Sequence, residues 1–304
     1  MLQRLSLATI TRESRGGELV EAFGPNCKLG EGPLWHPLRS RLFWFDIPKG
    51  RLISTNPFGG QQRGWSFGEP ASAAGWIDED RLLVATASGL QDFNLTTGVW
   101  EPVAALEDDE PLTRSNDGRC GPDGSFWIGT MGSKSESELG SIYRFNNGQL
   151  NKLASHITVP NSICFSPKGD LAYFTDTPGQ VIWKWELDSD GNPVGEKVPH
   201  IDLRDDGHFP DGSVCDAEGY LWNAQWDGWR LVRYAPDSSQ DRVIEMPVSR
   251  PTCPAFGGTD LRTLYVTSAS VGLSDEDLEA QPQAGQTFRI EVDVEGIPET
   301  KTNL

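Results

Sequence analysis

A short unit, a turn followed by an apolar strand, recurs along the whole chain. In each copy a cluster of small or polar residues precedes a run of apolar and often aromatic residues. The six runs are residues 42–46, 82–86, 126–130, 171–176, 220–222 and 264–267. Repeats of about 40 to 50 residues indicate β-propellers, in which each repeat forms one blade. The repeat therefore predicts an all-β fold, a six-bladed β-propeller with four-stranded antiparallel blades.

The segments between these units support the same fold. Residues 141–145, 181–185 and 231–234 alternate apolar and polar side chains, as half-buried strands do. Helical periodicity is nearly absent, and the acidic segment 274–279 is the best candidate for a helical turn. Because no linker divides the chain, a single propeller domain over residues 1–304 is expected. The strand near residues 19–23 is expected to pair with the last blade and close the ring, which removes open sheet edges.

The charge of the chain excludes two classes of partner. Its formal net charge is −18. A nucleic-acid backbone must be neutralised by Lys and Arg, and anionic membrane surfaces attract basic segments. Neither nucleic acid nor membrane is therefore expected as a partner. No stretch approaches the roughly 18 apolar residues of a membrane span, and no signal peptide is expected.

The cysteines indicate the compartment. There are five, an odd number, and none are spaced as Cys-x-x-Cys. Neither a disulfide framework nor a zinc-thiolate site is suggested, so buried free thiols are expected. A reducing, cytoplasmic location follows from this interpretation.

Side chains that carry oxygen occupy one register of the repeat, six positions ahead of each turn. The register contains Glu31, Ser72, Asn116, Asn161, Asp211 and Thr252. The first strand of each propeller blade lines the central channel. Equivalent positions on six inner strands would form a ring at one depth, and a packed apolar channel would not need oxygen there. The register therefore predicts a polar ring in the channel.

Three members of this ring suit a metal ion. Glu31, Asn161 and Asp211 offer two carboxylates and one amide oxygen, which suit hard cations such as Ca²⁺, Mg²⁺ or Mn²⁺. The lack of His and Cys disfavours a structural zinc site. Three protein ligands would leave room for water and substrate, and Asp211 could act as general base toward that water. The alternative is that Asp and Asn here are only turn formers.

Other polar and aromatic residues could complete the site. Arg114 precedes Asn116 by two residues and would share its strand face, where it could bind a substrate hydroxyl or carboxyl group, or pair with a nearby acid. His208 could reach the mouth of the site, although loop histidines are usually just solvated. Trp226 and Trp229 could form a wall of a sugar site or pack within their blade.

Several motifs resemble those of the regucalcin and gluconolactonase family, the senescence-marker-protein-like sugar lactonases. They are Gly-Glu-Gly-Pro at 30–33, Ser-Asn-Asp-Gly at 115–118, Pro-Asn-Ser at 160–162, Pro-Asp-Gly at 210–212 and Phe-Gly-Gly at 256–258. The resemblance spans residues 17–295. It implies a six-bladed propeller that hydrolyses sugar lactones with one divalent metal ion, bound by Glu31, Asn161 and Asp211. It also implies that Asp211 doubles as the base and that Arg114 and Asn116 contact the sugar.

The expected function is therefore metal-dependent hydrolysis of an aldonolactone, either gluconolactone-like or pentonolactone-like, to the open acid. Ca²⁺ is the first expectation for the metal, with Zn²⁺, Mg²⁺, Mn²⁺ and Fe²⁺ as alternatives. In relatives the region of residues 132–138 covers the sugar. The competing functions are an organophosphate or aryl-ester hydrolase on the same metal cage, a calcium-binding propeller without catalysis, and a propeller that only binds partners. The substrate is expected to be a small molecule, and the protein a monomer or weak homo-oligomer.

Overall fold

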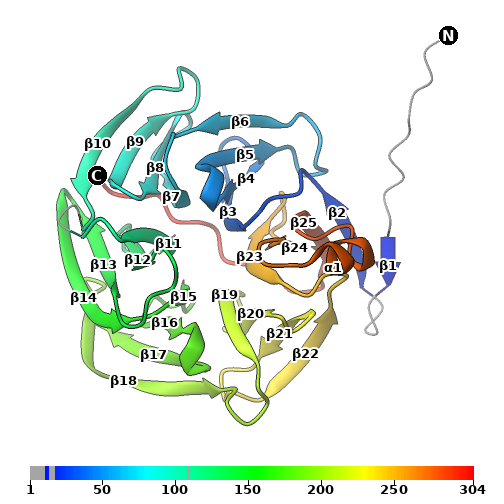
Figure 1. Cartoon of the computed structure of the whole chain (residues 1–304). Helices are drawn as coiled ribbons and strands as arrows, with labels where there is room; N and C mark the ends of the chain where they lie inside the picture. Colours follow the sequence, from blue (N-terminus) through cyan, green and yellow to red (C-terminus); the bar gives the residue numbers. More distant parts are fainter. Residues whose placement is uncertain (1–10, 14–17, 108–109) are drawn as a thin grey trace.

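The computed structural model describes residues 11–13, 18–107 and 110–304. Within these residues the strands form six antiparallel sheets arranged as blades around a central channel (Figure 1). Five sheets have four strands and the last has five. The six-bladed propeller predicted from the repeat is confirmed.

Within each blade the strands lie side by side, from an innermost strand at the channel to an outer strand at the rim. The innermost strands are β3 (Gly30–His36), β7 (Ala71–Trp76), β11 (Thr113–Cys120), β15 (Pro160–Phe165), β19 (Phe209–Cys215) and β23 (Pro251–Gly257). The second strands are β4 (Arg41–Asp46), β8 (Arg81–Thr86), β12 (Phe126–Gly132), β16 (Leu171–Asp176), β20 (Leu221–Trp226) and β24 (Thr263–Ser268). The third strands are β5 (Arg51–Thr55), β9 (Gly89–Asn94), β13 (Gly140–Asn146), β17 (Val181–Leu187), β21 (Arg230–Tyr234) and β25 (Thr287–Glu291). The outer strands are β6 (Arg63–Ser66), β10 (Trp100–Ala105), β14 (Gln149–Ile157), β18 (Pro193–Asp202), β22 (Gln240–Glu245) and β2 (Leu19–Phe23).

The last blade combines both ends of the chain. Its outer strand β2 pairs antiparallel with β25, with Val20 opposite Ile290 and Phe23 opposite Thr287. A further strand, β1 (Thr11–Glu13), extends this sheet beyond β2. The N-terminal strand therefore joins the first and last blades into a closed ring, as Figure 1 shows.

The core is divided among the blade interfaces. Among the described residues, six apolar clusters are buried, and each lies between two neighbouring blades. Trp44, Trp127 and Trp222 lie on the second strands of alternate blades and are fully buried. Because every blade packs on two neighbours, the positions of the inner strands around the channel are fixed by this packing.

Each inner strand has an irregularity near the register predicted to face the channel. In β15, for example, Asn161 pairs with Thr175, but the next pair is Cys164 with Tyr173, so the inner strand has one extra residue. The other five inner strands shift register at the corresponding place. A β-bulge of this kind bends the strand and changes the direction of its side chains. The bulges therefore shape the entrance to the channel.

Short helical segments and the chain end complete the fold. The 3₁₀ turns η1 (Ile47–Lys49) and η2 (Thr177–Gly179) follow β4 and β16. Helix α1 (Asp275–Ala280) begins after Ser274, which forms a capping box with Asp277, so the acidic segment expected to turn is helical. After β25 the chain returns across the channel (Figure 1). Within the described residues no helix has the length and apolar character needed to cross a membrane.

Candidate active site

A cavity of about 560 Å³ opens where the inner strands begin. Its lining includes Glu31, Arg114, Asn116, Asn161 and Asp211. These five residues lie on four different blades and are up to 180 residues apart in sequence (211 − 31). The propeller thus brings all the site residues selected from the sequence to one place.

The other two members of the predicted ring do not line this cavity. The Ser72 hydroxyl donates a hydrogen bond to Ser115 Oγ at 2.8 Å. The Thr252 hydroxyl contacts Gly30 O at 2.5 Å and Thr267 Oγ1 at 2.8 Å. Both hydroxyls therefore join neighbouring strands, and the expectation that all six oxygens face the channel is wrong for these two residues.

Small residues directly after the acidic and amide side chains make their placement possible. Gly32 and Ser162 have positive φ values of 56° and 58°, a conformation that costs glycine least. A Cβ on Gly32 would lie 2.1 Å from Ser72 O, and a Cβ on Gly212 would lie 2.4 Å from Cys253 Sγ. Larger residues at these glycines would push the inner strands apart and displace the side chains that precede them.

A chain of hydrogen bonds orients the amide of Asn161. Its Nδ2 donates to Thr177 Oγ1 at 2.9 Å, and its Oδ1 accepts from Asn116 Nδ2 at 3.0 Å. Asn116 Oδ1 in turn accepts from Arg114 Nη1 at 2.9 Å. These hydrogen bonds fix which atom of each amide donates and which accepts. The carbonyl oxygen of Asn161 therefore has a fixed position within the site.

The backbone around Asp211 is held equally firmly. Its carbonyl oxygen accepts hydrogen bonds from the Ser162 hydroxyl and from Asn223 Nδ2, the latter at 3.2 Å. Ser213 Oγ donates to Ser162 Oγ at 2.9 Å, which links β19 to β15. The carboxyl group of Asp211 is thus presented to the cavity from a rigid strand.

Three buried carboxyl groups share this site and disfavour one another's ionisation. Burial raises the pKa of Glu31 to about 8, and the nearby charge of Asp117 adds to the rise. Burial, followed by the charges of Glu31 and Asp117, raises the pKa of Asp211 well above its usual range. Burial also raises the pKa of Asp117 to about 6 and lowers that of Arg114 to about 10. Such a cluster would gain stability from a bound cation.

Comparison with known proteins identifies the family. A family model described as the SMP-30/Gluconolactonase/LRE-like region matches residues 29–270. The chain belongs to this family. The resemblance inferred from the motifs is therefore confirmed.

Three relatives of the SMP-30/gluconolactonase family illustrate the similarity. An L-arabinolactonase of Azospirillum brasilense is 37% identical over 86% of this chain and 87% of its own. A 6-deoxy-6-sulfogluconolactonase of Pseudomonas putida is 35% identical over 89% of this chain and 94% of its own. A crystal structure of regucalcin from Agrobacterium tumefaciens, described as a calcium-binding protein, has a TM-score of 0.90 and 40% identity, covering 92% of this chain and 95% of that one.

The donor set of this family member fits a hard divalent cation. Glu31, Asn161 and Asp211 are buried and supply oxygen donors alone, which suits Ca²⁺ better than soft metals. Within the described ranges no group of three or more His, Cys, Asp and Glu side chains is arranged as a metal site. The fit therefore depends on the amide oxygen of Asn161 together with the two carboxylates.

Asp117 is a buried acid that the sequence reasoning missed. It lies in the Ser-Asn-Asp-Gly motif at 115–118, of which only Asn116 was predicted to belong to the site. In the structure its Oδ2 accepts a hydrogen bond from Ile163 N at 2.7 Å and so joins β11 to β15. The signal in the sequence was its position beside Asn116 in the matched register.

The walls of the cavity combine apolar and polar groups. The remaining lining residues are Leu29, Pro48, Pro70, Met131, Ser133, Ser135, Val159, Thr177, Trp226 and Val271. Trp226 therefore forms a wall as one interpretation expected, and Ser133 and Ser135 place part of the 132–138 segment at the cavity. Trp229 and His208 are not among the lining residues. Trp229 is exposed, and the backbone carbonyl of His208 accepts a hydrogen bond from Gln180 Nε2.

Proposed function

We propose that this protein hydrolyses the ring ester of a sugar lactone, using a divalent cation held by Glu31, Asn161 and Asp211. The chain is an enzyme of a family whose relatives include an L-arabinolactonase and a 6-deoxy-6-sulfogluconolactonase. The observation that carries the proposal is the convergence of two buried carboxyl groups and an oriented amide on one cavity beside Arg114 and Asn116. An aldonolactone offers a carbonyl and several hydroxyl groups to such a site.

Asp211 is the proposed general base. Lewis-acid polarisation of the lactone carbonyl is the chemistry that a cation at this site would supply. Asp211 takes a proton from a water molecule as the water oxygen adds to the carbonyl carbon. The bond from this carbon to the ring oxygen then breaks, and the leaving oxygen takes the proton back from Asp211. Asp211 is buried, and its carboxyl group lines the cavity, so it lies where a water molecule beside the lactone carbonyl would be placed.

Arg114 and Asn116 are the proposed sugar-binding residues. Arg114 Nη1 donates to Ser115 O at 2.8 Å and to Asn116 Oδ1, so the guanidinium is already oriented. Its other N–H groups would donate to hydroxyl groups of the lactone. The apolar walls around Met131 and Trp226 would contact the carbon face of the ring and limit the access of bulk water.

One observation favours a second function. Leu29, Met131, Val159 and Trp226 give the cavity apolar walls that would also accept an aryl ester. A hydrolase of aryl esters or organophosphates on the same cation site is therefore the runner-up, and a calcium-binding propeller without catalysis is the third possibility.

Acid release tests all three functions together. Chelator-stripped protein would be supplied with Ca²⁺, Zn²⁺, Mg²⁺, Mn²⁺ or Fe²⁺ one at a time, and a pH-stat would follow gluconolactone, pentonolactones and phenyl acetate. The proposal expects faster acid release from a lactone than from phenyl acetate, and dependence on an added cation. Faster phenyl acetate hydrolysis would support the runner-up, and cation binding with no acid release would leave a binding protein.

The cytoplasm is the proposed location. All five cysteines are buried and free, as expected from their number and spacing. Free thiols persist in a reducing compartment.

A further inference from the structure

The C-terminal segment, residues 295–303, closes the end of the channel opposite the cavity. Its backbone hydrogen bonds go to Trp76, the last residue of β7, and to three residues in turns between inner and second strands, at the other end of the inner strands from Glu31 and Asp211. The bonds are Ala217 N to Glu295 O, Gly296 N to Leu261 O, Thr302 N to Trp76 O and Asn303 N to Gly124 O, each at 2.8 Å. The segment therefore ties together four blades.

Glycines of the propeller leave room for this segment. A Cβ on Gly75 would lie 2.0 Å from Thr302 Oγ1, and one on Gly124 would lie 2.5 Å from Asn303 Nδ2. Gly296, in the segment itself, packs so closely that a Cβ would lie 2.2 Å from Phe256. Such contacts on both sides indicate a built interface, in contrast to a chain end that rests loosely on the surface.

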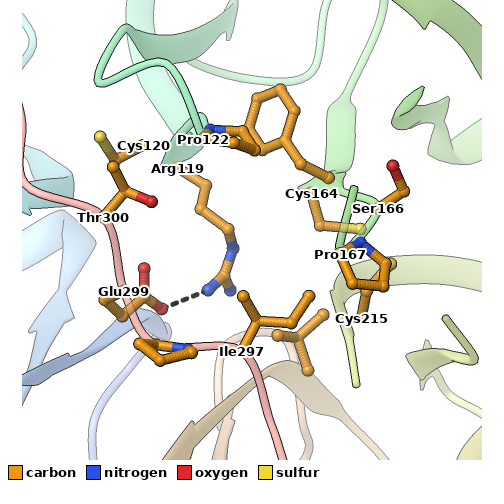
Figure 2. A pocket seen from close by; sticks show the side chains of 13 residues that line it. Arg119, Cys120, Pro122, Cys164, Ser166, Pro167, Cys215, Ile297, Glu299 and Thr300 are labelled. Carbon is orange, nitrogen blue, oxygen red and sulfur yellow. Dashed lines mark hydrogen bonds and ion pairs between the residues drawn. The ribbon is translucent and has the colours of Figure 1, made fainter. Parts of the chain in front are cut away.

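The segment places one carboxylate beside the guanidinium of Arg119. Glu299 Oε1 lies 2.6 Å from Arg119 Nη1, and the two side chains are 9% and 11% exposed (Figure 2). Arg119 Nη2 also contacts Ser213 O at 3.4 Å and Pro254 O at 3.2 Å. Arg119 extends from β11, so its guanidinium connects three inner strands to the C-terminal segment.

Arg119 also lies between the acids of the proposed cation site and the carboxylate of Glu299. It follows Asp117 by two residues on β11, and its guanidinium contacts Ser213 O, two residues after Asp211 on β19. On its other side is Glu299. The negative charge of Glu299 offsets that of Arg119, to which Glu299 is hydrogen-bonded (Figure 2).

We infer that Glu299 and Arg119 are positioning residues through which the C-terminal segment sets the cation affinity of the site. This inference rests on the proposed cation site at Glu31, Asn161 and Asp211. Without the charge of Glu299, the uncompensated guanidinium repels a cation in the channel and competes for the carboxylates of Glu31 and Asp117. Both effects weaken cation binding, although neither residue contacts the cation.

The test compares E299Q with a matched control. Asp123 pairs with Arg144 Nη2 at 2.6 Å with similar burial, 19% and 8% exposed, but lies away from the acidic cluster. D123N thus removes one carboxylate from an ion pair as E299Q does. Isothermal titration of Ca²⁺ into the chelator-stripped full chain would give the dissociation constant, and the Tm without cation would report stability. E299Q is expected to weaken Ca²⁺ binding by on the order of tenfold, and D123N by less than twofold.

Two further variants separate charge from folding. E299D keeps the charge and is expected to bind Ca²⁺ within about threefold of wild type, even if its Tm falls. The double variant R119M/E299M has neither charge and is expected to bind Ca²⁺ more tightly than E299Q. If E299Q does not fold, the inference requires that the dissociation constant of the double variant for Ca²⁺ equals that of wild type.

Equal dissociation constants for E299Q and D123N, or binding by R119M/E299M as weak as that of E299Q, would overturn the inference. Wild-type protein that binds no divalent cation would overturn the proposed function as well, and is thus a different result.

Discussion

The stability of the cation-free protein should fall as the pH rises from 5.5 to 8. Burial, with the charge of Asp117, raises the pKa of Glu31 from 4.5 to about 8 in the folded chain. A carboxyl group whose folded pKa lies above its unfolded value stabilises the fold when protonated. This contribution is complete below about pH 4.5 and is lost as the pH rises toward 8.

The size of this effect follows from the pKa shift. One pKa unit corresponds to about 1.4 kcal/mol, so the change from 4.5 to about 8 corresponds to on the order of 5 kcal/mol for Glu31. About 3 kcal/mol of this would be lost between pH 5.5 and pH 8, since the slope is about 1.4 kcal/mol per pH unit. Asp211, whose pKa is also raised, acts in the same direction. A saturating divalent cation should cancel most of the loss, because it stabilises the ionised form.

Urea unfolding at pH 5.5 and 8, at fixed ionic strength, would measure this difference with a chelator and with Ca²⁺. The net charge of −18 also makes stability depend on pH, so E31Q is the necessary control. In E31Q the cation-free protein should lose clearly less free energy of unfolding over this range than wild type does. An equal loss in wild type and E31Q would refute the assignment of the effect to Glu31.

Three further predictions concern the proposed chemistry. D211N should lower kcat by about 10²- to 10⁴-fold, the usual contribution of a general base, and turnover at the wild-type rate with a cation bound would contradict the role of Asp211. T177V removes the acceptor that orients the Asn161 amide and should weaken Ca²⁺ binding several-fold by titration calorimetry, whereas T158V, a threonine just before β15, should not; equal affinities would show that the amide needs no such support. R114M should raise KM for a lactone by about tenfold or more, the cost of lost charged hydrogen bonds, and an unchanged KM would remove Arg114 from the sugar-binding residues.

The repeat was sufficient to predict the fold because blades share a strand pattern that appears in local sequence. The turn-and-strand runs correspond to the second strands, such as β4 and β16, and the oxygen-bearing residues six positions ahead of each turn fall on inner strands. Within that register the carboxylate and amide oxygens of Glu31, Asn161 and Asp211 indicated a cation site, the family motifs implied the same three residues, and all three line one cavity. Their chemical roles stay predictions.

Contacts between distant residues could not be predicted in the same way. A hydroxyl at Ser72 has the right register, but its direction depends on Ser115 in the next blade, 43 residues later. The bulge in β11 places Asn116 at the cavity and buries Asp117 against β15, so simple alternation of side chains does not reveal this third acid. Arg119 and Glu299 are 180 residues apart, and no local pattern connects them.

The pairing of β2 with β25 has a consequence for synthesis of the protein. Residues 19–23 leave the ribosome long before their partner strand, residues 287–291, has been made. A nascent chain therefore carries a strand without its partner over this interval, and the ring can close only when the blade of β25 has been made. Truncated chains produced by premature termination should expose that strand and be prone to aggregation.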